Sequence, residues 1–220
     1  MSVSVPKRAL VTAVLVALVA LLAGGIWLYR SLSHVPTFYT QALGATESEL
    51  KQSSREMLRR VAALNNDVKR PGKWEALFTD QQVNGWLAVD VPKNHPDLIP
   101  PQAHSPRLQI VPGRLLAGAQ VDGAVSAVVS VELDIRLTGD NVVAVRIQKL
   151  RVGNLPWGLD EIIDEVVAAA SDLGIRVEQT QSDGDPVLLL TMPAEFDKRQ
   201  VFLERLELRD GEVYLAGQTK

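Results

Sequence analysis

The sequence contains no cysteine, and aromatic residues make up only 5% of its 220 positions. The absence of cysteine excludes a disulfide framework, a thiolate metal site, a cysteine nucleophile and a lipid-modified cysteine anchor. The scarcity of aromatic rings removes the usual surface for stacking sugars or nucleobases. With 23 basic and 26 acidic residues the net charge is −3, which gives no general reason to bind nucleic acid.

The sequence also lacks the common catalytic signatures. It contains no Gly-rich phosphate loop and no Gly-x-Ser-x-Gly elbow. His95, Asp97 and His104 lie in a proline-rich loop over residues 91–106, but their spacing does not place ligands together on one helix face or hairpin. We therefore predict a protein that is not an enzyme, with no cofactor and no metal site. A hydrolase that uses Asp97 or His104 is the open alternative.

A long uncharged segment lies near the N-terminus. Residues 9–29 carry no charge, Lys7 and Arg8 precede them, and Arg30 follows. A helix of this length is about 31 Å long, close to the thickness of a hydrocarbon core. The segment predicts a transmembrane anchor over residues 1–30 with the N-terminus inside. The predicted localisation is the cytoplasmic (inner) membrane, single-pass, with the domain over 31–220 outside, periplasmic or extracellular. A signal peptide cleaved after Gly25 is the alternative.

The next segment is helical in pattern. Its apolar residues recur at intervals of seven: Leu43, Leu50, Met57 and Leu64. This spacing predicts one long amphipathic helix over about 37–68, whose stripe either packs on the domain or forms a coiled coil with a partner or a second copy. A second helix begins after Thr79, which forms a capping box with Gln82, and ends near Val89.

From Arg107 onward the apolar period changes to two. Apolar and polar side chains alternate along residues 124–137, a segment about 46 Å long if fully extended. A strand of that length twists, so it must coil around something apolar. The broad apolar stripe over residues 159–173 predicts a helix that fills this role. The predicted fold class is α+β: an N-terminal transmembrane helix, then a long curved antiparallel β-sheet wrapped on amphipathic helices.

Two segments carry the most specific motifs, LFTDQQVNGWL over residues 77–87 and LRVGNLPW over residues 150–157. Both resemble the YpmS-like families of uncharacterised, single-anchor exported bacterial proteins, which show a polar-capped helix, long strands and a V-G-x-L-P turn into a helix. This sequence departs from that pattern with Val83 for the usual Leu and with Trp157-Gly158 after Pro156. The resemblance implies a fold similar to tubular lipid-binding domains, with an apolar interior that binds lipid or another hydrophobic ligand.

We predict a membrane-anchored, extracytoplasmic, non-enzymatic domain that binds lipid or another hydrophobic ligand. Strand alternation and the helical stripe select the expected lining residues: Val129, Val131, Leu133, Ile162, Val166 and Leu189. The alternative is an envelope scaffold or interaction module that uses the 37–68 helix. The predicted partners are therefore the membrane through residues 9–29, a lipid ligand, and a protein partner or a second copy, but no nucleic acid.

Overall fold

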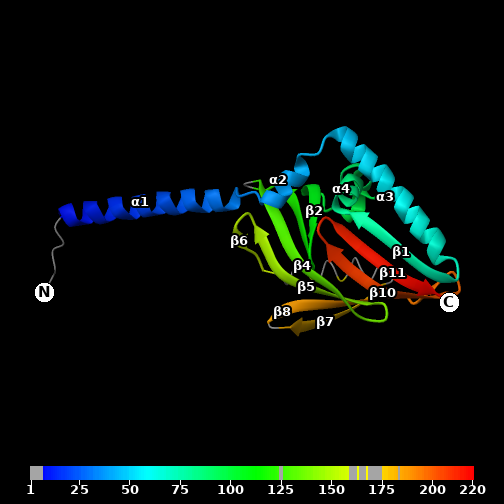
Figure 1. Ribbon diagram of the computed structural model, residues 1–220. Helices are drawn as coiled ribbons and strands as arrows, with labels where there is room; N and C mark the ends of the chain where they lie inside the picture. Colours follow the sequence, from blue (N-terminus) through cyan, green and yellow to red (C-terminus); the bar gives the residue numbers. More distant parts are fainter. Residues whose placement is uncertain (1–6, 124–125, 159–162, 164–166, 168–174, 183) are drawn as a thin grey trace.

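The computed structural model describes residues 7–123, 126–158, 163, 167, 175–182 and 184–220, with the side chains of the first helix given from Ala20 onward. The fold is α+β and contains two curled antiparallel sheets (Figure 1). Helix α1 (Lys7–Leu32) extends away from the sheets, at the opposite end of the molecule from the C-terminus. The other helices are α2 (Thr37–Leu43), α3 (Glu47–Val68), α4 (Asp80–Val89), α5 (Val91–Asn94) and the 3-10 helix η1 (Pro96–Leu98).

The larger sheet has the strand order β2-β3-β4-β5-β8-β7, with the short β6 paired to β5. Its strands are β2 (Ala103–Val111), β3 (Arg114–Val121), β4 (Ala127–Gly139), β5 (Val142–Val152), β6 (Leu155–Pro156), β7 (Arg176–Ser182) and β8 (Asp185–Thr191). The smaller sheet has the order β1-β11-β10-β9. Its strands are β1 (Gly72–Thr79), β9 (Glu195–Phe196), β10 (Arg199–Arg209) and β11 (Glu212–Thr219).

The structure corrects the prediction of a transmembrane anchor. Within the described residues, no helix is both long enough and apolar enough to cross a membrane. The prediction of a transmembrane helix over 1–30 is therefore wrong, as are the single-pass topology and the inner-membrane localisation that rested on it.

The predicted long helix over 37–68 is two helices. Helix α2 ends at Leu43, and α3 begins after Thr46, whose hydroxyl accepts the Glu49 N–H while the Glu49 carboxylate accepts the Thr46 N–H. This capping box starts a new helix, so the chain changes direction at residues 44–46 although the apolar spacing continues across them. The predicted second helix is confirmed: α4 follows Thr79, whose capping box with Gln82 is present, and ends at Val89.

The proline-rich segment is more ordered than predicted. Residues 91–106 contain α5 and η1, and β2 already begins at Ala103. Strand β1 was not predicted, although its side chains alternate: Trp74 and Phe78 are buried, while Lys73 and Glu75 are exposed. Strand β1 forms one edge of the smaller sheet, and α3 packs along it.

The two faces of the larger sheet differ in chemistry. On the inner face Leu133 pairs with Ile147, and on the outer face Glu132 pairs with Lys149. Gln148 lies between these two pairs with no partner in β4, so it forms a bulge. Because the bulge inserts one residue, Leu150 also points inward and pairs with Val131, which keeps apolar side chains on one face along the whole of β5.

The inner face carries the core. One buried cluster joins the two sheets through Trp74, Val143 and Leu203, and a second contains Ile147, Leu188 and Ile163. Val145 and Leu190 contact both clusters, so the apolar surface is continuous along the strands. We call this surface the inner trough: the inward side chains of β4, β5 and β8, covered at one end by the smaller sheet and at the other by Ile163 and Val167.

Two buried asparagines bind the backbones of edge or bulged strands. The Asn141 side-chain amide donates to the Val201 carbonyl at 2.6 Å and accepts the Leu203 N–H at 2.6 Å, which connects the β4–β5 turn to β10. The Asn84 amide makes the same pair of contacts with the Leu108 N–H and carbonyl, both at 2.8 Å, and so connects α4 to edge strand β2. Each amide satisfies two backbone groups that the sheets leave unpaired.

Helix α1 is held to the larger sheet at its C-terminal end. The Asn154 N–H donates to the Ser31 carbonyl at 2.9 Å, and the Gly153 N–H donates to the Val128 carbonyl at 2.8 Å. Gly153 has a φ of +60°, and a Cβ built there would lie 2.2 Å from the Ser31 carbonyl oxygen. Only glycine therefore fits between the end of α1 and the β5–β6 turn.

We predict that Asn141→Gly lowers the free energy of unfolding by about 2–4 kcal/mol, because it leaves two buried backbone groups without partners. Glycine keeps the positive φ of 60° that Asn141 adopts, so the loss reports on the amide and not on backbone strain. Urea denaturation provides the measurement, with Asp140→Ala in the same turn as the control. Equal stability of Asn141→Gly and wild type would show that the amide does not join the sheets.

Candidate ligand-binding site

The inner trough contains three of the six predicted lining residues. Val129, Val131 and Leu133 point inward from β4, and Val131 and Leu133 pack against the cluster of Ile147, Ile163 and Leu188. Ile163 and Val167, which are both helical and lie four residues apart, contact this same cluster. A helical face therefore lies against the curved sheet at this point, as the apolar stripe over 159–173 predicts.

The other predicted lining residues do not join them. Leu189 pairs with Ala144 and Glu178, and it alternates with Leu188 and Leu190, which point inward. Leu189 therefore lies on the outer face of the sheet. Ile162 and Val166 lie outside the described residues, and so do most positions of the predicted 159–173 helix.

The inward side chains of β4 form an unbroken aliphatic row. Its members are Val129, Val131, Leu133, Ile135 and Leu137, and all five are partly buried. Their partners on β5 and β8 are more enclosed, since Ile147 is 4% exposed and Leu188 1% exposed. The row is thus less enclosed than its partners, and it carries no charged or polar side chain.

The two histidines of the proline-rich segment each lie near one carboxylate. His104 Nε2 lies 2.9 Å from a carboxylate oxygen of Asp122, and both side chains are about half exposed. His95 lies 4.0 Å from Asp90, next to the Trp86 ring. Among the residues that the structure describes, no group of three or more His, Asp or Glu side chains is arranged to hold a metal ion.

A separate groove, not predicted from the sequence, lies between α2, α3, α4 and β2. It has a volume of about 590 Å³. Three carboxylates line it, those of Glu49, Glu56 and Asp80, together with amide side chains that include Gln41 and Gln81. None of the described residues that line the groove is basic. We call it the acidic groove.

Burial raises the pKa of Asp80 above its ordinary value, and the nearby carboxylate of Asp210 acts in the same direction. Backbone N–H groups of Gln81 and Ile110 oppose this by stabilising the charged form. Burial is the largest of these effects, and no basic residue among the described residues that line the groove offsets it.

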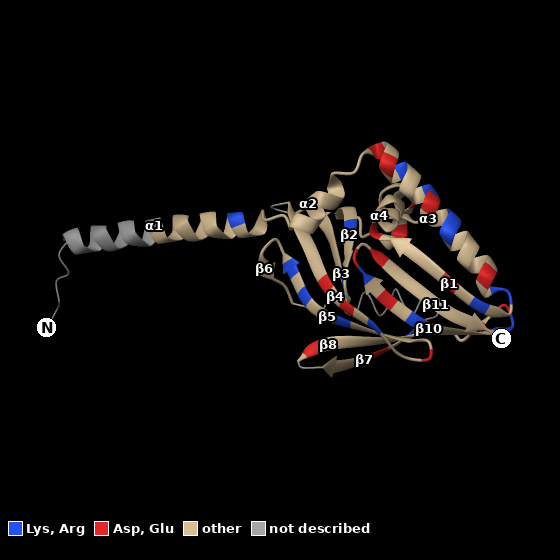
Figure 2. Cartoon of the chain, viewed as in Figure 1, with Lys and Arg blue, Asp and Glu red and all other residues tan. Residues whose placement is uncertain are grey.

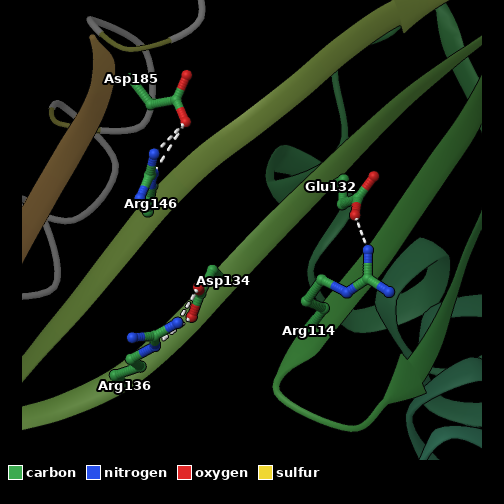
Figure 3. Close-up of polar contacts among 6 residues, drawn as sticks. All are labelled: Arg114, Glu132, Asp134, Arg136, Arg146 and Asp185. Atoms are coloured by element: carbon green, nitrogen blue, oxygen red, sulfur yellow. Dashed lines mark hydrogen bonds and ion pairs between the residues drawn. The ribbon is translucent and has the colours of Figure 1, made fainter. Parts of the chain in front are cut away.

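The outer face of the larger sheet carries ion pairs that run across its strands (Figure 3). Arg114 on β3 and Lys149 on β5 both bind the Glu132 carboxylate on β4, Lys149 at 3.0 Å. Arg146 on β5 binds Asp185 of β8 at 2.8 Å. Figure 2 shows acidic and basic residues interspersed along these strands.

Burial raises the pKa of Glu132, but hydrogen bonds from Lys149 and Arg114 outweigh that effect and leave the pKa below its ordinary value.

Arg107 is a buried cation on the same outer face. It is 7% exposed, its Nη1 donates to the Pro106 carbonyl at 2.8 Å, and its Nε has no partner. Tyr39 lies next to it, 1% exposed, and donates its hydroxyl to the Ser105 carbonyl. Burial raises the pKa of Tyr39, so the phenol is neutral and supplies no negative charge to Arg107.

Comparison of the chain with protein-family models, with curated proteins and with solved structures gives no match. The resemblance to YpmS-like proteins therefore stays a prediction.

We predict that Glu132→Gln lowers the free energy of unfolding by about 1–2 kcal/mol at pH 7, because the carboxylate accepts hydrogen bonds from two cations. The folded-state pKa of Glu132 lies below the unfolded value, so this contribution is present above the unfolded pKa and is lost as the pH falls through the folded pKa.

Urea denaturation at pH 7 and at stepwise lower pH tests this, since the difference between variant and wild type should shrink toward zero in acid. Glu207→Gln, which removes a more exposed ion pair with Arg209, is the matched control and should change stability little. A difference for Glu132→Gln that is independent of pH would contradict the electrostatic explanation.

Proposed function

We propose that the protein is a non-enzymatic binding module whose inner trough takes an apolar ligand, with a lipid acyl chain as the best fit. The observation that carries this proposal is the row of five partly buried aliphatic side chains on β4. Apolar surface of this kind gains roughly 25 cal/mol for each Å² that a ligand removes from water. The row has no polar group that would prefer a polar ligand.

The length of the trough supports an elongated ligand. Strand β4 has 13 residues, which corresponds to about 43 Å at roughly 3.3 Å per residue. Val145 and Leu190 connect the two buried clusters, so the apolar surface continues from the end covered by Ile163 to the end covered by the smaller sheet. An extended hydrocarbon chain matches such a surface in both shape and chemistry.

We predict that Val131→Trp reduces binding of an apolar ligand, because the indole would occupy the second inward position of the β4 row. The fluorescent fatty acid cis-parinaric acid serves as the probe, with the full chain in titrations followed by fluorescence. Binding should weaken at least about tenfold, equivalent to about 1.4 kcal/mol. Leu133→Trp, one inward position along the strand, should have the same effect.

Thr138→Trp, at the exposed end of the same strand, is the matched control and should bind as wild type does. Circular dichroism and thermal unfolding establish that each variant folds. Native mass spectrometry of the gently purified full chain adds an independent measurement, since a bound lipid raises the mass by a defined amount. A wild-type chain that carries no lipid and does not bind the probe would rule out the proposal.

The acidic groove favours a second function, the binding of a basic segment of a partner protein. Its volume lies within the range of about 300–1,000 Å³ typical of binding pockets. Its three carboxylates lie on two helices: α3 contributes Glu49 and Glu56, and Asp80 begins α4. The negative charge of the groove therefore favours lysine- and arginine-rich chains. This function would use α3, which lies within the 37–68 segment that the sequence predicts for an interaction module.

A fluorescently labelled hexalysine peptide tests the acidic groove. Glu56→Gln and Asp80→Asn should each weaken binding of the peptide. The double variant should also make the affinity less dependent on salt concentration, because fewer charges face the peptide. Glu47→Gln, an exposed carboxylate on α3 outside the groove, is the control and should leave binding unchanged. If all three variants bind the peptide alike, the attraction is general to the acidic chain and the groove is not the site.

A further inference from the structure

A small pocket lies between the segment joining α1 to α2 and the outer face of the larger sheet. We propose that it binds a phosphate group, either inorganic phosphate or the phosphate ester of a small alcohol. The pocket has a volume of about 220 Å³. It lies on the opposite face of the sheet from the inner trough, so this inference is independent of the proposed function.

Cross-strand pairing fixes the floor of the pocket. Ser130 on β4 pairs with Arg151 on β5, and in the adjacent row Glu132 pairs with Lys149. All four residues line the pocket, and Phe38 of α2 and His34 of the linker form its walls. Because the floor is made of paired strands, the Cα atoms of its charged residues are held at fixed spacing.

The charges of the pocket sum to a positive value. The Glu132 carboxylate is already shared between Lys149 and Arg114, which leaves one positive charge in excess in that group of three. Arg151 adds a second, and no carboxylate within the described part of the chain forms an ion pair with it. The chain as a whole has a net charge of −3, so this surplus is local. It attracts a dianion such as phosphate.

The pocket also offers donors that suit a tetrahedral anion. The Arg151 guanidinium presents a planar pair of N–H groups that matches two phosphate oxygens, and the Ser130 hydroxyl and the Asn154 side-chain amide supply further donors. The carbonyl groups at the end of α1 are negative in character, but Ser31 O already accepts the N–H groups of Asn154 and His34. The carbonyl groups at the end of α1 therefore repel a bound anion less than free carbonyl groups would.

Arg107 adds to the positive potential of this row. It pairs with Gly118, which in turn pairs with Ser130, so Arg107, Ser130 and Arg151 lie along one line across the outer face. Arg107 is buried and has no ion-pair partner among the residues described. Its charge is therefore weakly screened by water. A buried guanidinium without a counter-ion is stabilised when an anion binds on the same row.

Isothermal titration calorimetry of the full chain with sodium phosphate tests the proposal, at constant ionic strength set by sodium chloride. We expect saturable binding of phosphate. The unfolding temperature should rise with the phosphate concentration and not with the chloride concentration. A parallel titration with glycerol 3-phosphate distinguishes the sources: tighter binding identifies an ester, and equal or weaker binding identifies inorganic phosphate. If neither compound binds saturably, the pocket is not a phosphate site.

Variants locate the binding within the molecule. Arg151→Gln should weaken phosphate binding at least about tenfold. Because Arg151 is exposed, its replacement should leave the unfolding temperature in chloride unchanged. Ser130→Ala should weaken binding by a smaller factor. Arg176→Gln, an exposed arginine on β7 outside the pocket, is the matched control and should bind phosphate as wild type does. Equal losses in Arg151→Gln and Arg176→Gln would overturn the assignment.

Discussion

The arrangement of the two sheets depends on side-chain amides that bind strand backbones. Asn141 joins the β4–β5 turn to the bulged region of β10, and both of its contacts go to main-chain groups. Reciprocal contacts between turns reinforce this: the Gly113 N–H donates to the Leu208 carbonyl, and the Gly211 N–H donates to the Ile110 carbonyl. These bonds are directional, unlike apolar packing, so they define where the smaller sheet covers the inner face and where that face stays accessible.

The larger sheet is divided into an apolar face and a charged face. The bulge at Gln148 keeps Ile147 and Leu150 on the same side, and it keeps Lys149 on the other side next to Glu132. Without the extra residue, the second half of β5 would place its charges against the trough. One irregular position thus keeps the charged side chains of β5 out of the inner trough and places Lys149 and Arg151 on the opposite face.

The sequence predicts the features that local interactions determine. Thr79 and Gln82 cap α4 through contacts within four residues, and the alternation along β4 predicts its long strand and inward row. The same local rule would also have found the break before α3, since Thr46 and Glu49 form a capping box, but the regular apolar spacing across it suggested one helix. Likewise, the alternation of Trp74 and Phe78 with charged residues is a signal for β1.

The remaining features depend on how distant segments meet. Nothing near Gln148 in the sequence indicates a bulge, because a bulge is defined by the register of two strands. The acidic groove joins Glu56 and Asp80 from different helices, and its shape follows from the close crossing of α3 and α4 at Gly85, where a Cβ would lie 2.6 Å from the Ser54 nitrogen. Leu189 falls on the outer face for a related reason, since in a continuous apolar run the pairing partners decide which residues point inward.

The contact at Gly153 has a mechanical consequence. Because the end of α1 rests directly on the β5–β6 turn, with no side chain between them, the helix cannot pivot freely about that point. A force acting on α1 enters the larger sheet through Asn154 and Gly153, and the Gly153 N–H passes it to Val128 at the start of β4. The aliphatic row begins at the next residue, Val129, so two hydrogen bonds and one turn connect the end of α1 to the start of that row.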